Sequence, residues 1–269
     1  MHGPWNLANI PFDATCTELV RDRNDLFYLV CAASFVEIAA DLYSDNLATH
    51  CEEHGQIVAW LRGSWQPEEV QHGRALRGYV RHVWPAFDWD QAYAEFFAEY
   101  SKSCTIEAYE PTLALEMVAR CVVETGTASF YQTLEEISEE PVLKGIAARI
   151  RADEIRHYKH FYRYFRELGA GKQPSRWQIL RAITRRLLEA RQHDARCALW
   201  HAYSVRNAGR VLDERDFDKT FHQLVRQFRQ RLPIMMATKM LLKPLGLPSG
   251  ISKALVGPVV AWTGWVLRR

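Results

Sequence analysis

Two copies of a Glu-x-x-His pattern are the residues best able to do chemistry in this sequence. One reads E-V-Q-H from Glu69 to His72, and the other reads E-I-R-H from Glu154 to His157. Residues three apart on a helix face the same way, so each pattern can offer a carboxylate and an imidazole to one point. One copy is expected by chance in this composition, whereas two copies on long helices indicate a site.

A glutamate in an apolar stretch precedes each pattern. Glu37 lies 32 residues before the glutamate of the first pattern, and residues 52–55, which form a predicted turn, lie midway. Glu124 lies 30 residues before the glutamate of the second pattern, and the predicted turn at residues 138–141 also lies midway. In an antiparallel helix pair, residues equidistant from the turn lie at one height, here roughly 22–24 Å from it. Two helical hairpins would then place six side chains in one layer: Glu37, Glu69, His72, Glu124, Glu154 and His157.

These six side chains are of the types that bind a pair of metal ions. Four buried carboxylates are very costly without positive charge nearby. Carboxylates and imidazoles suit iron, and bridging glutamates can hold two ions together. We therefore predict two iron ions, with a manganese–iron pair as an alternative. The set matches the carboxylate site of ferritin-like four-helix bundles. If the residues were instead ordinary surface glutamates and structural histidines, both turns would fall midway by accident.

Two further acidic residues flank the patterns. Glu68 and Asp153 each come directly before a predicted ligand glutamate and four residues before a predicted ligand histidine. This spacing places them to accept a hydrogen bond from an imidazole N–H and so to orient the ring. For Glu68, a solvent-exposed position is the alternative.

Both patterns resemble the signatures of a known family. The stretch W-Q-P-E-E-V-Q-H-G from Trp65 to Gly73 is similar to the W-x-x-E-E-x-x-H-G signature of soluble acyl-(acyl carrier protein) desaturases, and A-D-E-I-R-H from Ala152 to His157 is similar to their A-D-E-x-R-H signature. The resemblance covers roughly residues 20–168. It implies a dimeric helical fold whose di-iron centre uses O2 and two electrons from a ferredoxin to desaturate an acyl chain. It also implies the same six ligands.

The resemblance further marks Thr127, which lies three residues after Glu124. The family has a threonine there, near the face that binds oxygen, and its hydroxyl could relay protons during catalysis. The alternative is a helix threonine bonded to its own backbone.

Helical periodicity recurs along the chain and strand signals are nearly absent. We predict an all-α, ferritin-like four-helix bundle over residues 1–170 and a basic helical C-terminal extension over residues 171–269, packed on the bundle or docking a partner or membrane. The expected bundle helices cover about residues 18–51, 56–84 (interrupted near Pro67), 111–137 and 142–168, with a shorter helix at 89–100. The extension is expected to hold helices at 176–205 and 215–242 and a tail broken by proline and glycine from residue 243.

Composition limits the class of protein. Hydrophobic residues are 48% and charged residues 25%, which excludes disorder. Residues 170–269 hold 19 Lys/Arg against 6 Asp/Glu, whereas residues 1–169 are acidic. The basic segment has three readings: it docks an acidic carrier protein, it binds anionic lipid at the membrane periphery, or the acidic part of the same chain neutralises it. No nucleic-acid motif accompanies the charge, so no nucleic-acid partner is expected.

The location expected from the sequence is cytoplasmic, with peripheral membrane contact as the alternative. The 6 cysteines include no C-x-x-C pair, which fits thiols in a reducing compartment. No signal peptide is recognised at the N-terminus. The longest uncharged stretch, residues 254–267, is too short to span a bilayer.

The leading hypothesis is an O2-dependent di-iron oxidoreductase that acts on an unactivated C–H bond of a fatty-acyl-like or other long apolar substrate. Desaturation and hydroxylation by a monooxygenase both remain open. A homodimer with an external, ferredoxin-like electron donor is expected, because no flavin, nicotinamide or iron–sulfur motif is visible. The spacing of the first two ligand helices is closer to that of aldehyde-deformylating oxygenases, which makes deformylation one alternative. A non-catalytic iron-binding protein is another.

Overall fold

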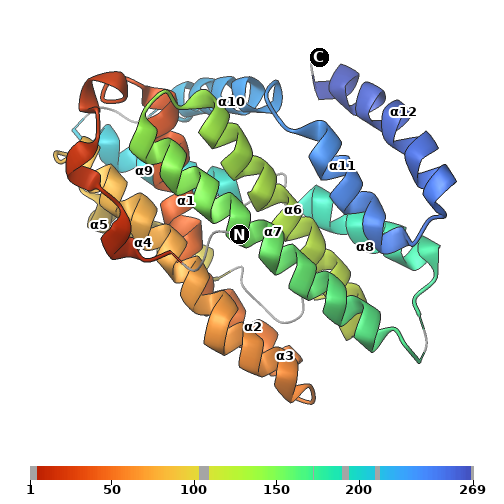
Figure 1. Ribbon diagram of the computed structural model, residues 1–269. Helices are drawn as coiled ribbons and strands as arrows, with labels where there is room; N and C mark the ends of the chain where they lie inside the picture. The colour runs from red at the N-terminus through yellow and green to blue at the C-terminus, as the bar shows by residue number, and fades with distance from the viewer. Residues whose placement is uncertain (1–4, 103–108, 172, 190–193, 210–212, 268–269) are drawn as a thin grey trace. The chain divides into compact units, whose positions relative to one another are not determined.

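A computed structural model describes residues 5–102, 109–171, 173–189, 194–209 and 213–267. The described residues form helices and no strand (Figure 1), which confirms the all-α prediction. Their contacts divide the chain into two compact units. Unit 1 comprises Met1–Ala108, Leu134–Arg149 and Gln192–His222, and unit 2 comprises Tyr109–Thr133, Ile150–Arg191 and Gln223–Arg269. The domain boundary near residue 170 stays a prediction.

Unit 1 is built around a long apolar segment. Helices α1 (Asn24–Ile38) and α2 (Ala40–His50) follow each other directly, and α1 lies against α4 (Gln66–Val83) and α9 (Asp194–Arg206). By length and composition alone, Asn24–His50 is apolar enough to cross a membrane, with a mean hydropathy of 1.6 over its most apolar 18 residues. However, 61% of this 18-residue stretch is buried within the protein. The segment is thus placed like the core helix of a globular unit.

The first long helix begins later than expected and is not continuous. Residues 17–19 form a 3-10 turn, the α-helix begins at Asn24, and it breaks at Ala39. Arg23 has non-helical dihedral angles, and its side chain pairs with Asp25 in the first turn of α1 at 2.8 Å. An acidic side chain at this end favours the helix start, because the helix dipole is positive there.

The second helix of the hairpin contains a π-helical turn. Helix α3 (Gly55–Trp60) passes into the π turn η4 (Leu61–Trp65), and α4 then begins at Gln66. The interruption that we predicted near Pro67 is present, but the irregular backbone precedes the proline. Pro67 follows this π turn closely, near the start of α4, and it lacks the N–H that a regular continuous helix would bond to an earlier carbonyl.

The second predicted hairpin is present as α6 (Leu113–Ile137) and α7 (Pro141–Leu168). The crossover helix expected at 89–100 is α5 (Trp89–Tyr100), which packs on α9. Residues 103–108 of the crossover lie outside the described residues. The predicted positions of all the bundle helices therefore agree with the structure to within a few residues, apart from the start and break of the first.

The C-terminal hundred residues are divided more finely than expected. The helix predicted over 176–205 is two helices, α8 (Arg176–Glu189) and α9, and the residues between them lie outside the described part of the chain. The helix predicted over 215–242 is α10 (Glu214–Arg229) and α11 (Ile234–Leu242). Pro233 directly precedes α11. The predicted helix divides here because proline lacks the N–H that an uninterrupted helix requires.

The tail from residue 243 was expected to be broken, and for its last part this prediction was wrong. After the short turn η6 (Lys243–Leu245), α12 runs from Ser249 to Leu267 with Pro258 inside it. Helix α12 packs against α11. The described side chains of α12 are mostly exposed or half-buried, so burial of an apolar face does not account for its continuation through Pro258.

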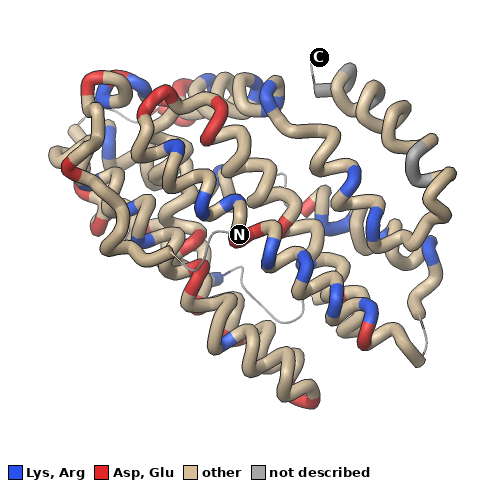
Figure 2. The backbone as a smooth tube through the Cα atoms, viewed as in Figure 1, with Lys and Arg blue, Asp and Glu red and all other residues tan. Residues whose placement is uncertain are grey.

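Lys and Arg recur along α8 and the helices α9 and α10 that follow it (Figure 2). Within unit 2, two of these arginines meet acidic partners from the start of the α6 region. Arg185 donates to Glu110 at 2.8 Å, and Arg186 lies 3.5 Å from Glu116. Part of the basic segment is therefore neutralised inside the chain, as the third of the three readings expected.

Candidate metal centre

Three of the six predicted ligands come together in unit 1. Glu37 lies in the last turn of α1, and Glu69 and His72 lie one turn apart near the start of α4. All three are buried, with 5%, 5% and 0% of their surface exposed. Each offers a ligand atom within 4.8 Å of the others, and Nδ1 of His72 lies 3.7 Å from Oε2 of Glu37. We call these residues the first trio.

A glycine lets the two helices of the first trio approach closely. Gly73 follows His72 on α4, and a Cβ atom at this position would lie 2.6 Å from the backbone N of Ile38 and 3.0 Å from Cβ of Glu37. Real side chains do not tolerate such distances to a backbone atom. Glycine is therefore required where α4 crosses the end of α1, directly beside two of the ligands.

The other three predicted ligands come together in unit 2. Glu124 lies on α6, and Glu154 and His157 lie one turn apart on α7. Their exposed fractions are 2%, 0% and 1%. Nδ1 of His157 lies 3.7 Å from Oε2 of Glu124 and 4.0 Å from Oε2 of Glu154, and the three ligand atoms lie within 4.8 Å of one another. We call these residues the second trio.

The two trios have the same composition and a matching internal geometry. In each, a glutamate from one helix meets a Glu-x-x-His pair from the next, and the imidazole Nδ1 lies 3.7 Å from that first glutamate. Two carboxylates and one imidazole form a donor set that suits iron or manganese. Each trio alone could hold a metal ion.

Burial and a neighbouring carboxylate disfavour the charged form of Glu124 in the second trio. The pKa of Glu124 is raised, because burial penalises its charged form and the neighbouring carboxylate of Glu154 repels that charge. The nearby His157 acts in the opposite direction but does not cancel the increase. A bound divalent cation would favour both ionised carboxylates, so the arrangement fits a metal site better than it fits a structural cluster.

Thr127 is directed at the second trio. Its hydroxyl lies 2.7 Å from Oε2 of Glu154, and it also lies 3.3 Å from the carbonyl O of Val123 and 3.2 Å from that of Glu124. The structure therefore shows both alternatives that the sequence left open, a contact with the ligand site and hydrogen bonds to the helix's own backbone. The shortest one is to the ligand carboxylate, so Thr127 is placed to donate its proton to Glu154.

The two flanking acids differ in their surroundings. Asp153 is buried and accepts a hydrogen bond from Arg156 at 2.6 Å. Glu68 is half-buried in the first turn of α4. Their predicted hydrogen bonds to imidazole rings stay predictions.

The buried, positively charged side chain of Arg120 on α6 was not predicted from the sequence. Arg120 donates to Glu116 at 2.8 Å, and both side chains are buried. Burial alone would lower the pKa of Arg120, but the charge of Glu116 outweighs it and Glu124 adds to the increase, so the guanidinium stays charged. The signal was available, because Glu116, Arg120 and Glu124 follow one another at the four-residue spacing that puts them on one helix face.

Comparison with known proteins gives a partial match. No family model matches the chain. The putative acyl-[acyl-carrier-protein] desaturases DesA2 of two Mycobacterium tuberculosis strains, CDC 1551 / Oshkosh and ATCC 25618 / H37Rv, are each 32% identical to this chain over 133 residues. The match covers 45% of this chain and 45% of each relative, so it spans less than half of the curated proteins' length. The relation to acyl-(acyl carrier protein) desaturases that the two motifs indicate is thus supported by curated sequences as well as by the motifs.

Proposed function

We propose that the two trios close around a pair of iron ions and that the chain is an O2-dependent oxidoreductase acting on a fatty-acyl-like substrate. The observation that carries the proposal is the repeated trio: two buried sets of Glu, Glu and His with the same internal geometry. A manganese–iron pair would use the same donors. When bound, the metal pair would supply the reduction of O2 and the removal of hydrogen from an unactivated C–H bond.

The chain's own residues would hold this chemistry in place. Glu37, Glu69 and His72 would bind from the first trio, and Glu124, Glu154 and His157 from the second. Both trios are buried, so bulk water is kept away from the reacting atoms. Thr127 would hold a proton at Oε2 of Glu154, from which it could be passed on during turnover.

The substrate and partners are proposed from the relatives' names and from charge. The matched relatives are named for an acyl group carried on an acyl carrier protein. Exposed arginines of α8, such as Arg176 and Arg181, could attract such an acidic carrier by electrostatic steering. An external, ferredoxin-like donor would deliver the electrons, and we expect a cytoplasmic homodimer.

Metal and product analysis on the purified chain tests the proposal. We expect about two irons per chain, as in other carboxylate bundles, and O2-dependent formation of an oxidised or desaturated product from an acyl carrier substrate with a reduced ferredoxin. Release of a one-carbon fragment from a fatty aldehyde would instead indicate deformylation. Loading of many irons without organic product would indicate storage and contradict the proposal.

A matched pair of variants on α7 ties the metal to the predicted ligands. Glu154→Ala should lose metal and all turnover, because it removes a buried ligand. Glu167→Ala changes a glutamate on the same helix that pairs with Arg163 at the surface, and it should keep both. Full metal content in Glu154→Ala would contradict the assignment of the site.

A further inference from the structure

A second group of metal-ligand side chains lies in unit 1, apart from both trios in sequence. Helix α5 carries Glu95 and Glu99, and helix α9 carries Cys197 and His201. Both pairs have four-residue spacing, which puts the two members of each pair on one face of their helix. The two helices pack against each other, although about a hundred residues separate them in the sequence.

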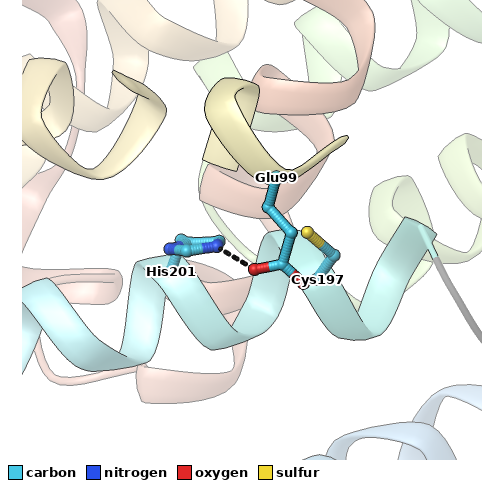
Figure 3. Close-up of side chains that lie close together, drawn as sticks. All are labelled: Glu99, Cys197 and His201. Atoms are coloured by element: carbon cyan, nitrogen blue, oxygen red, sulfur yellow. Dashed lines mark hydrogen bonds and ion pairs between the residues drawn. The ribbon is translucent and has the colours of Figure 1, made fainter. Parts of the chain in front are cut away.

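Three of these side chains meet closely. Glu99 reaches from α5 to α9, between Cys197 and His201 (Figure 3). Nε2 of His201 lies 2.9 Å from Oε2 of Glu99, and Glu99, Cys197 and His201 each offer a ligand atom within 4.8 Å of the others. Neighbouring ligands of a tetrahedral zinc ion lie roughly 3.4 Å apart, given metal–ligand distances near 2.1 Å. Glu99 is exposed and can adjust to close the remaining gap.

The second ring nitrogen of His201 gives an independent indication. The residue is 8% exposed, and its Nδ1 atom is buried and makes no hydrogen bond to any described residue. The nearest acidic atom is Oε2 of Glu95 at 3.6 Å. Metal-bound histidines commonly face a carboxylate on the nitrogen that does not bind the metal, which fixes the ring and its tautomer. Glu95 is placed for this role.

We propose that Glu99, Cys197 and Nε2 of His201 bind a divalent ion of the zinc class, with Glu95 orienting the imidazole and solvent completing the coordination. The donors are a thiolate, an imidazole and a carboxylate, a set that zinc accepts and that differs from the oxygen-rich trios. Cys197 and His201 are buried while both glutamates are exposed, so the ion could enter from the solvent side. The thiol would release its proton to solvent on binding. The site does not depend on the function proposed above.

Cobalt(II) titration of the full chain tests this site. A thiolate bound to cobalt gives a charge-transfer absorption in the near ultraviolet that carboxylate and imidazole ligands do not give. The trios contain no cysteine, so cobalt bound to their carboxylates and imidazoles alone would not give this band. We expect the band to rise to one equivalent of cobalt per chain and to disappear when zinc is added.

Variants assign the band to its residues. Cys197→Ser should abolish the band. His201→Ala should weaken cobalt binding by more than about tenfold, and Glu95→Gln should weaken it by less than His201→Ala does. Cys16→Ser removes an exposed thiol elsewhere in unit 1 and should leave the titration unchanged. Far-ultraviolet circular dichroism checks that each variant is folded. If Cys197→Ser does not fold, Glu99→Ala at the exposed rim must lower cobalt affinity in its place.

Three outcomes would overturn the proposal. The first is the absence of a thiolate–cobalt band in the unmodified chain. The second is a band that survives Cys197→Ser, and the third is a band that is lost in Cys16→Ser.

Discussion

The hydroxyl of Thr127 on α6 lies 2.7 Å from Oε2 of Glu154 on the facing helix α7. A hydrogen bond to an ionised carboxylate contributes more than one between neutral groups. Thr127→Val keeps the shape of the side chain and removes this donor. We expect the variant to retain its metal while O2-dependent turnover falls about 10- to 100-fold, from the loss of one hydrogen bond to a charged group.

Thr127→Ser restores the hydroxyl and serves as the matched control. It should recover most of the turnover lost in Thr127→Val. Product formation under single-turnover conditions, with metal content measured in parallel, separates an effect on chemistry from an effect on binding. An unchanged rate in Thr127→Val would remove the proposed role of this residue.

Gly73 governs the approach of α1 and α4. In Gly73→Ala the new Cβ would meet the backbone N of Ile38 at 2.6 Å, so the helices must separate. Overpacking of this kind costs about 1–3 kcal/mol of unfolding free energy. Urea unfolding measures the loss, and metal titration should show weaker binding at the first trio.

Gly126 provides the control for this substitution. It lies in helix α6, and a Cβ added there meets no atom within 4 Å. Gly126→Ala should be neutral or stabilise the protein by up to about 1 kcal/mol, because alanine favours the helix. Equal destabilisation by both substitutions would show that the close approach at Gly73 is unimportant.

Glu140 fixes the turn between α6 and α7. Its buried carboxylate accepts hydrogen bonds from the hydroxyl of Tyr79 and from the backbone N–H groups of Val142 and Leu143 at the start of α7. Burial and the charge of Glu140 raise the pKa of Tyr79, so its hydroxyl stays a donor. Glu140→Ala leaves several buried donors without this acceptor and should cost about 3 kcal/mol.

The neighbouring Glu139 is exposed and gives a direct comparison. Glu139→Ala should change the urea midpoint little, since exposed substitutions away from special contacts are usually small. A similar midpoint for the two alanine variants would contradict the capping role of Glu140.

The start of α1 should contribute a pH-dependent part of stability. Burial alone would raise the pKa of Asp25, but the hydrogen bond and charge of Arg23 outweigh it, so the pKa is lowered. A carboxyl whose pKa is lower in the folded state stabilises the protein above its unfolded value, near 3.9, and this contribution is lost as the pH falls through the folded value. Both side chains are partly exposed, so the contribution is at most about 1 kcal/mol.

Asp25→Asn isolates this contribution. The variant should be less stable than the unmodified protein at pH 7, and the difference should shrink at pH 3. Urea unfolding at both pH values measures it, with Asp22→Asn at an exposed neighbouring position as the control. A difference that stays constant between the two pH values would refute the ion-pair explanation.

The ligand hairpins could be predicted because their information is local. The spacing of Glu37 and Glu69 about a turn fixes their relative height, and helical geometry then brings them together without knowledge of the rest of the fold. The same argument places Glu124 with Glu154. The joining of the two trios into one centre depends on how the two hairpins meet, which spacing within each hairpin does not determine.

Other features depend on tertiary contacts that no short pattern encodes. Pro258 predicted a break, but α12, which contacts α11, runs through this position as one helix. The cluster of Glu99, Cys197 and His201 joins two helices that are about a hundred residues apart in the sequence, so spacing could not reveal it. Pro233, by contrast, is a local signal that indicates a boundary between two helices.

The π turn at Leu61–Trp65 also sets the direction of the first trio. A π turn holds one residue more than an α turn of the same span, so it shifts the rotational phase of all that follows by about 100°. Glu69 and His72 lie downstream of that shift, whereas Glu37 does not. Removing a single residue from this turn would swing the carboxylate and imidazole of α4 around the helix axis and away from α1, although every ligand would still be present in the chain.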